Sequence, residues 1–114
     1  MRKLINSFRF AINGIRSVWC EEENFRIEIV IGVIVLLMGF ILDLLIIEWI
    51  FIIGCIGAVI AAEMLNTAVE DLCNKIEPNA DPVIGKIKDI MGGFVLVVSL
   101  VSVTIGIIIF SDYL

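Results

Sequence analysis

Three long apolar runs constrain this chain more than any other feature of its sequence. They cover about residues 27–42, 44–66 and 91–110, and a helix needs roughly 20 apolar residues to cross a bilayer. Hydrophobic residues make up 61% of the 114 residues, whereas a soluble domain averages about 45–50%. We therefore predict an all-α membrane protein, with one domain over residues 1–114 and three transmembrane helices.

The basic residues are distributed unevenly along the chain. All eight lie before the first apolar run or between the second and the third: Arg2, Lys3, Arg9, Arg16, Arg26, Lys75, Lys86 and Lys88. Loops that stay in the cytoplasm carry an excess of lysine and arginine. We therefore expect the N-terminus and the 74–91 loop to be cytoplasmic, and the 43–48 turn and the C-terminus to face outward.

Residues 3–20 have the pattern of an amphipathic helix that precedes the first span. Its apolar residues recur at helical spacing: Leu4, Phe8, Ala11, Ile12, Ile15, Val18 and Trp19. Arg2, Arg9 and Arg16 form a stripe on another face. A basic face opposite an apolar one is typical of a helix that lies in the membrane interface. The alternative is an amphipathic helix that packs on a partner.

Four polar residues follow the second apolar run on one face of the same predicted helix. They are Glu63, Asn66, Glu70 and Asn74, which fall on one side at about 100° per residue. A carboxylate near the hydrocarbon is costly and needs a partner or a function. The ordinary alternative is a polar cap where the helix leaves the membrane, which fits Asn74 better than Glu63.

Charged clusters at the starts of the first and third spans should reach the same cytoplasmic level. Glu21, Glu22, Glu23 and Glu28 precede or enter the first span, and Lys86, Lys88 and Asp89 enter the third. Mg²⁺ takes one or two carboxylates together with phosphate oxygens, and lysine complements phosphate charge. Together the clusters could hold Mg·ATP, although each alone is more simply a solvated charge run or an interfacial anchor. The chain has neither a Walker motif nor a kinase glycine-rich loop.

Several motifs give the chain a family resemblance. E-x-x-N-T-A-x-E at 63–70, G-K-x-K-D at 85–89 and GIRSVWCEEENFRI at 14–27 together resemble the small bacterial membrane kinases of diacylglycerol and undecaprenol. The resemblance implies a multi-pass protein of the bacterial inner membrane that transfers the γ-phosphate of Mg·ATP to a lipid hydroxyl at the cytoplasmic surface. It also implies a homotrimer whose active sites are shared between neighbouring chains, and no nucleic-acid partner.

The same resemblance assigns roles to individual residues. Glu63 corresponds to the catalytic base, and Glu22 and Glu70 to the carboxylates that hold the metal ion. Asn66 and Asn74 have supporting roles, and Glu28 joins Glu63 in binding the lipid substrate. The positions implied to bind ATP are Lys3, Glu22, Glu70, Asn79, Asp81, Lys88 and Asp89.

Two positions leave the lipid substrate open. Asn74 stands where these kinases usually carry aspartate, which removes a charge. The diacylglycerol kinases more often carry glutamate at the position of Glu28, whereas the undecaprenol kinases more often carry histidine there. The motifs N-T-A-x-E and E-x-N-F-R-I, in contrast, favour the undecaprenol kinases.

Two other classes of function fit parts of the sequence. A small transporter would use Glu63 as a membrane-embedded proton or cation site, but it would leave the 85–89 motif unexplained. A membrane scaffold would use the polar face around Glu63 as an interface between helices. A kinase that has lost turnover through Asn74 is a third alternative, disfavoured because the base and both metal carboxylates are present.

Overall fold

The computed structural model describes residues 1–114 as four helices and no strands. Helix α1 spans Arg2–Glu21, α2 spans Glu23–Leu42, α3 spans Ile46–Ile76 and α4 spans Pro82–Ser111. The last three are each long and apolar enough to cross a membrane. The predicted fold class, an all-α membrane protein with three membrane-spanning helices, is therefore confirmed.

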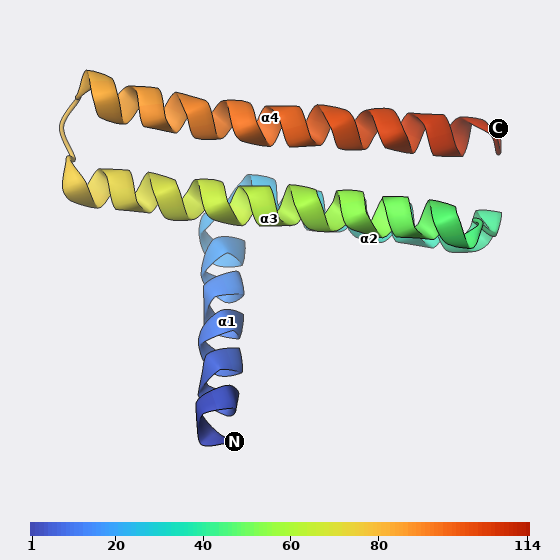
Figure 1. The fold of residues 1–114 in the computed structure, drawn as a ribbon, viewed down its shortest axis with the longest axis horizontal. Coiled ribbons are helices and arrows are strands. Elements are labelled where there is room, and N and C mark those ends of the chain that lie inside the picture. The colour runs from blue at the N-terminus through green and yellow to red at the C-terminus, as the bar shows by residue number, and fades with distance from the viewer.

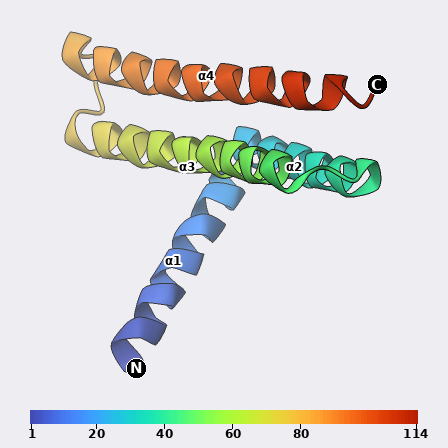
Figure 2. The same ribbon diagram turned by 45° about the vertical axis from the view of Figure 1, so that its right-hand side comes forward.

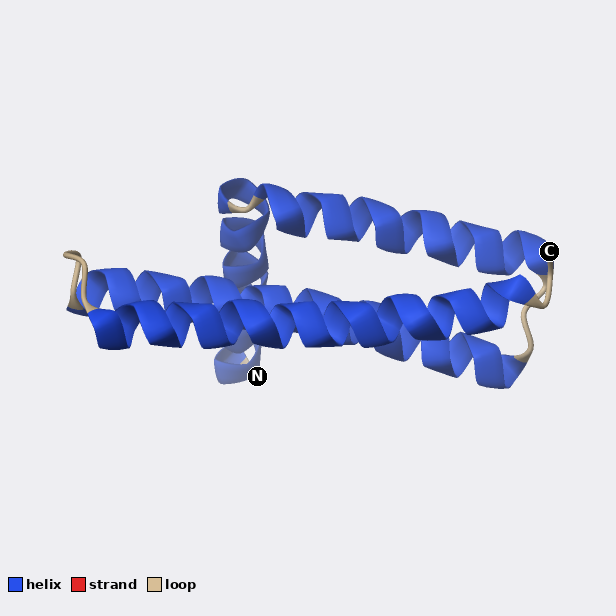
Figure 3. Ribbon diagram, turned by 90° about the horizontal axis from the view of Figure 1, so that it is seen from above, coloured by secondary structure: helices blue, strands red, loops and turns tan.

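The three apolar helices lie alongside one another, and α1 runs crosswise to them. Figure 1 shows α2, α3 and α4 along the long axis of the molecule, with the N-terminus at the free end of α1. The turned view and the view from above keep the same arrangement (Figures 2 and 3). A helix at this orientation to the spans can lie in the plane of the membrane surface, and the large apolar side chains of α1, such as Phe8 and Phe10, are exposed to receive lipid.

A tight turn joins α2 to α3 and depends on a glycine. Asp43 ends α2 in the left-handed conformation, with φ of 62°, and the Leu44 amide donates a 3.2 Å hydrogen bond to the Gly39 carbonyl. A Cβ atom on Gly39 would lie 2.8 Å from Leu44 Cδ1 and 3.0 Å from Trp49 Cη2. The absence of a side chain at Gly39 therefore lets α3 pack directly against the end of α2.

The start of α3 and the end of α4 are joined through one carboxylate. Glu48 Oε1 accepts a hydrogen bond of 2.9 Å from the Leu45 amide at the start of α3, and it also accepts one from the Tyr113 hydroxyl just after α4. The small buried cluster of the chain lies at the same end, where Leu44, Ile52 and Ile109 pack together. The pairing of α3 with α4 is thus fixed at the end opposite the 77–81 loop.

The hydrogen bond between Tyr113 and Glu48 should shift the pH at which this tyrosine ionises. The hydrogen bond to Glu48 raises the pKa of Tyr113 above its ordinary value, because the neutral phenol is the form that donates. The contact should stabilise the fold fully below about pH 10 and lose its effect as the pH rises through the raised pKa. Tyr113 is the chain's one tyrosine, so phenolate absorbance reports on it alone. Glu48→Gln should lower its pKa toward the ordinary value, and identical titrations in both proteins would contradict the contact.

Few residues are shielded from the surroundings by the chain itself. Only 11 of the 114 residues are buried, and most large apolar side chains of the three long helices are exposed. In a bilayer these side chains face hydrocarbon or other helices, so exposure here is what a membrane-spanning protein requires.

Candidate active site

Acidic residues gather where α1, α2 and α3 meet. Glu63 of α3 is only 6% exposed, and its carboxyl group lies within hydrogen-bonding reach of that of Glu28 on α2. Glu22 and Glu70 are close enough to act on Glu63 through their charges. The structure therefore brings together the predicted base, both predicted metal carboxylates and the predicted substrate residue Glu28.

The contact between Glu28 and Glu63 leaves hydrogen-bonding capacity unused. Glu28 Oε2 is buried and has no hydrogen-bond partner in the chain. Two carboxylates in contact repel unless a proton or a cation lies between them, and a buried acceptor without a donor is costly. The pair is therefore suited to receive a hydrogen-bond donor such as an alcohol, and to accept its proton.

The corner between α1 and α2 positions Glu22. This residue has extended backbone angles, φ of −116° and ψ of 112°, and separates the two helices. Arg26 reaches back and donates from Nη1 to the Trp19 carbonyl at 2.6 Å and to the Cys20 carbonyl at 3.2 Å. A guanidinium that satisfies the last carbonyl groups of α1 stabilises this helix end, and with it the placement of Glu22.

A basic residue on α4 is oriented by the polar face of α3. Lys88 Nζ donates a hydrogen bond of 2.6 Å to Asn74 Oδ1. Because Asn74 is neutral, it orients the ammonium group without cancelling its charge, which leaves Lys88 able to attract phosphate. Asp89, the next residue, is exposed, as is Lys86 on the same helix.

The loop between α3 and α4 contains two of the predicted ATP-binding residues. Asp81 caps α4, since its Oδ2 accepts from the Val83 amide at 3.1 Å and from the Ile84 amide at 3.0 Å. Asn79 is exposed, and its backbone amide donates to Glu77 Oε1 at 3.2 Å. A capping role is therefore visible for Asp81, and nucleotide binding by both residues stays a prediction.

Of the remaining predicted site residues, one lies beside the acidic cluster and the other lies far from it. Asn66, one turn from Glu63 on α3, is half-buried beside it. Lys3, in contrast, stands at the far end of α1, nineteen residues from Glu22, which is about 28 Å of helix. The chain does not bring Lys3 to its own acidic cluster.

The acidic cluster supplies only part of what a metal ion needs. The chain holds no group of three or more acidic, cysteine or histidine side chains close enough to form a complete metal site. Mg²⁺ does not need one, because it commonly arrives with phosphate oxygens and waters and takes only one or two carboxylates from the protein. Glu22 and Glu70, which both act on Glu63 through their charges, supply carboxylates of this kind.

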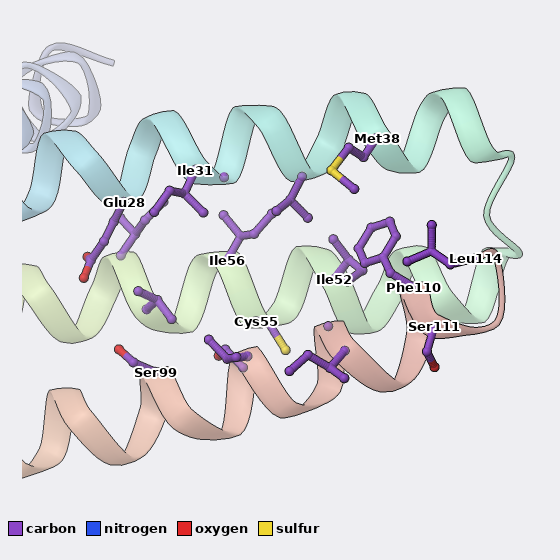
Figure 4. A pocket seen from close by; sticks show the side chains of 18 residues that line it. Glu28, Ile31, Met38, Ile52, Cys55, Ile56, Ser99, Phe110, Ser111 and Leu114 are labelled. Carbon is purple, nitrogen blue, oxygen red and sulfur yellow. The ribbon is translucent and has the colours of Figure 1, made fainter.

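An apolar groove extends away from the acidic cluster between α2, α3 and α4. Its volume is about 590 Å³ and its lining is mostly aliphatic. Figure 4 shows Glu28 at one end of the groove, with Phe110 and Leu114 at the other. Glu63 does not line the groove, but it contacts Glu28, which does. The groove therefore connects a space that suits hydrocarbon to a carboxylate pair.

Sequence reasoning missed several residues of this region. Ser99, Ser102 and Ser111 line the groove from α4, and the Glu48–Tyr113 contact joins α3 and α4 at the end opposite the 77–81 loop. The signal for the serines was present, since Ser99 and Ser102 are hydroxyl residues three apart within an apolar run. Nothing in the sequence linked Glu48 to Tyr113, which are far apart along the chain.

Known proteins with similar sequences agree on the type of reaction. A family model described as prokaryotic diacylglycerol kinase matches residues 9–110. An undecaprenol kinase from Bacillus subtilis is 34% identical over 110 residues, which cover 96% of this chain and 89% of that protein. A diacylglycerol kinase from Haemophilus influenzae is 34% identical over 86 residues, 75% of this chain and 73% of that one.

A more distant relative extends the comparison. The diacylglycerol kinase of Escherichia coli K12 is 27% identical over 101 residues, covering 89% of this chain and 83% of that protein. The relatives thus divide between two lipid substrates but share one chemistry. The matched region includes the acidic cluster, the polar face of α3 and the Lys88–Asp89 pair. The chain therefore belongs to the prokaryotic diacylglycerol kinase family and is a membrane-embedded lipid kinase.

Proposed function

We propose that this kinase transfers the γ-phosphate of ATP to the hydroxyl group of a membrane lipid, either diacylglycerol or undecaprenol, at the cytoplasmic surface and in the presence of Mg²⁺. One observation carries the proposal. The half-buried Glu28 lies at one end of an apolar groove, and its carboxyl group is within hydrogen-bonding reach of the buried Glu63, so a lipid hydroxyl in the groove can meet a proton acceptor without leaving the membrane.

The reaction requires mainly positioning and charge stabilisation from the protein. Glu63 accepts the proton of the lipid hydroxyl while that oxygen bonds to the γ-phosphorus and the bond from phosphorus to the leaving β–γ bridging oxygen breaks. Lys88, held by Asn74, attracts the phosphates from α4. A magnesium ion bound with the nucleotide would be held by Glu22 and Glu70 and would neutralise phosphate charge.

The placement of Lys3 favours sites shared between chains. In its own chain this residue lies at the opposite end of α1 from the acidic cluster. We therefore propose a homotrimer in which the α1 helix of one chain extends toward the nucleotide end of its neighbour. Residues 74–91 and the acidic cluster occupy the same half of α3 and α4, and we assign that half, with the N-terminus, to the cytoplasmic side.

Phosphate transfer from labelled ATP to defined lipids tests the proposal. The purified protein in phosphatidylcholine vesicles should phosphorylate diacylglycerol or undecaprenol when Mg²⁺ is present, and a chelator should remove the activity reversibly. Transfer that continues at full rate in the chelator would contradict the role of Mg²⁺. Absence of transfer to either lipid, together with proton-driven uptake without ATP, would instead favour a transporter built around Glu63.

A further inference from the structure

Two serines of α4 present unused hydroxyl groups to the apolar groove. Ser99, Ser102 and Ser111 all line it. Ser111 Oγ donates to the Ile108 carbonyl at 3.0 Å, and Thr104, on the same helix, donates to the Leu100 carbonyl at 2.8 Å. This is how a hydroxyl in a helix usually satisfies itself. Ser99 and Ser102 make no such bond, so both can donate into the groove.

Ser99 lies at the membrane depth of the catalytic carboxylates. The hydrogen bond between Asn74 and Lys88 gives the approximate register of α3 against α4. Glu63 stands eleven residues before Asn74, and Ser99 stands eleven residues after Lys88. Since antiparallel helices rise equally per residue, Glu63 and Ser99 are level with each other. Figure 4 shows Ser99 at the same end of the groove as Glu28.

Ser102 belongs to the same polar end. It is one helical turn from Ser99 and lines the same groove. Across the groove, α2 packs closely on α3 one turn from Glu28, because a Cβ on Gly32 would lie only 3.2 Å from Ile56 Cγ2. One end of the groove therefore combines the Glu28 carboxyl group, which contacts Glu63 behind it, with two free hydroxyl donors, and the rest of the lining is nearly all apolar.

These donors and acceptors require different partners. The carboxyl pair accepts a hydrogen bond and is satisfied by an alcohol, including the buried Glu28 Oε2. The serine hydroxyls need acceptors, and a donor left unpaired in hydrocarbon is unfavourable. A polyprenol brings one hydroxyl group and no further acceptor. An acylglycerol brings its hydroxyl next to ester carbonyls, which only accept hydrogen bonds.

We propose that Ser99 and Ser102 make this groove selective for a diacylglycerol, by donating hydrogen bonds to its ester carbonyls while its hydroxyl faces Glu28 and Glu63. The acyl chain then occupies the apolar part of the groove. This proposal rests on the lipid kinase function proposed above and names the acceptor class for the same site.

The test compares lipids that differ only in their carbonyl groups. Protein in phosphatidylcholine vesicles is assayed with dioleoylglycerol, with the ether analogue that carries the same oleyl chains, and with undecaprenol. We expect kcat/KM for the ester to exceed that for the ether by about tenfold or more. The double variant Ser99→Ala/Ser102→Ala should lose this preference and keep its rate on the ether. Ser111→Ala, which removes a hydroxyl already bonded at the other end of the groove, should keep the preference.

Several outcomes would overturn the selectivity while leaving the kinase intact. These are equal rates on ester and ether in the wild type, a preference for undecaprenol, or an equal loss on all lipids in the double variant. A double variant with changed assembly on size-exclusion chromatography would show that a second copy, and not a lipid, covers this face. Absence of transfer to every lipid would overturn the proposed function itself, and this proposal with it.

Discussion

Glu63→Gln should fold and assemble normally but lose phosphate transfer, with kcat reduced about 100- to 10,000-fold. Glutamine keeps the shape of the side chain and can still hydrogen-bond to Glu28, so the buried contact survives. It cannot accept the proton of the lipid hydroxyl, which is the step assigned to this residue. The rate of transfer from labelled ATP to the preferred lipid measures the effect, and size-exclusion chromatography in detergent checks the assembly.

A matched control separates catalysis from general charge effects. Asp71 is an exposed acid on the same helix, and Asp71→Asn removes one negative charge without touching the Glu28–Glu63 pair. This variant should keep kcat close to that of the wild type. Full turnover by Glu63→Gln would eliminate Glu63 as the base. A loss of assembly together with activity would favour the scaffold interpretation instead.

Lys88→Gln should raise the KM for ATP about 10- to 100-fold, because a charged hydrogen bond to phosphate is lost. The glutamine can still contact Asn74, so the packing of α3 against α4 is kept while the positive charge is removed. Initial rates at varied ATP and saturating lipid give the change in KM, and the KM for the lipid should stay constant.

The same helix offers a control for this substitution. Lys86 is exposed and makes no side-chain hydrogen bond, whereas Lys88 is half-buried against Asn74. Lys86→Gln removes an equal charge near the same membrane surface. If both variants raised the KM for ATP equally, the effect would come from the surface potential, and a specific phosphate contact at Lys88 would be excluded.

The sequence was sufficient for the fold class because membrane helices follow simple rules. Backbone groups in hydrocarbon must be bonded within the helix, so a long apolar run specifies its own secondary structure. The polar face from Glu63 to Asn74 could likewise be assigned by helical periodicity alone, and the structure places both residues on α3. The bonding of Asn74 to Lys88 needed the fold, since it depends on the register of two helices.

Contacts between distant residues could not be predicted in the same way. Glu28 meets Glu63 where α2 packs on α3, and the absence of side chains at Gly32 and Gly39 permits this close packing. The sequence assigned Glu28 a role in substrate binding only through the family resemblance, and it assigned no role to Ser99 or Ser102. Their importance follows from the groove, which is a property of three helices together.

The small number of buried residues has a consequence for how this protein must be handled. Each long helix is stable by itself in a bilayer, but the chain shields only 11 residues from its surroundings. Much of what holds the helices in this arrangement must then come from lipid molecules, and from the neighbouring chains of the homotrimer proposed above, both of which act by mass action. The ratio of lipid to protein in a preparation is therefore a thermodynamic variable of the fold, comparable to the concentration of a ligand.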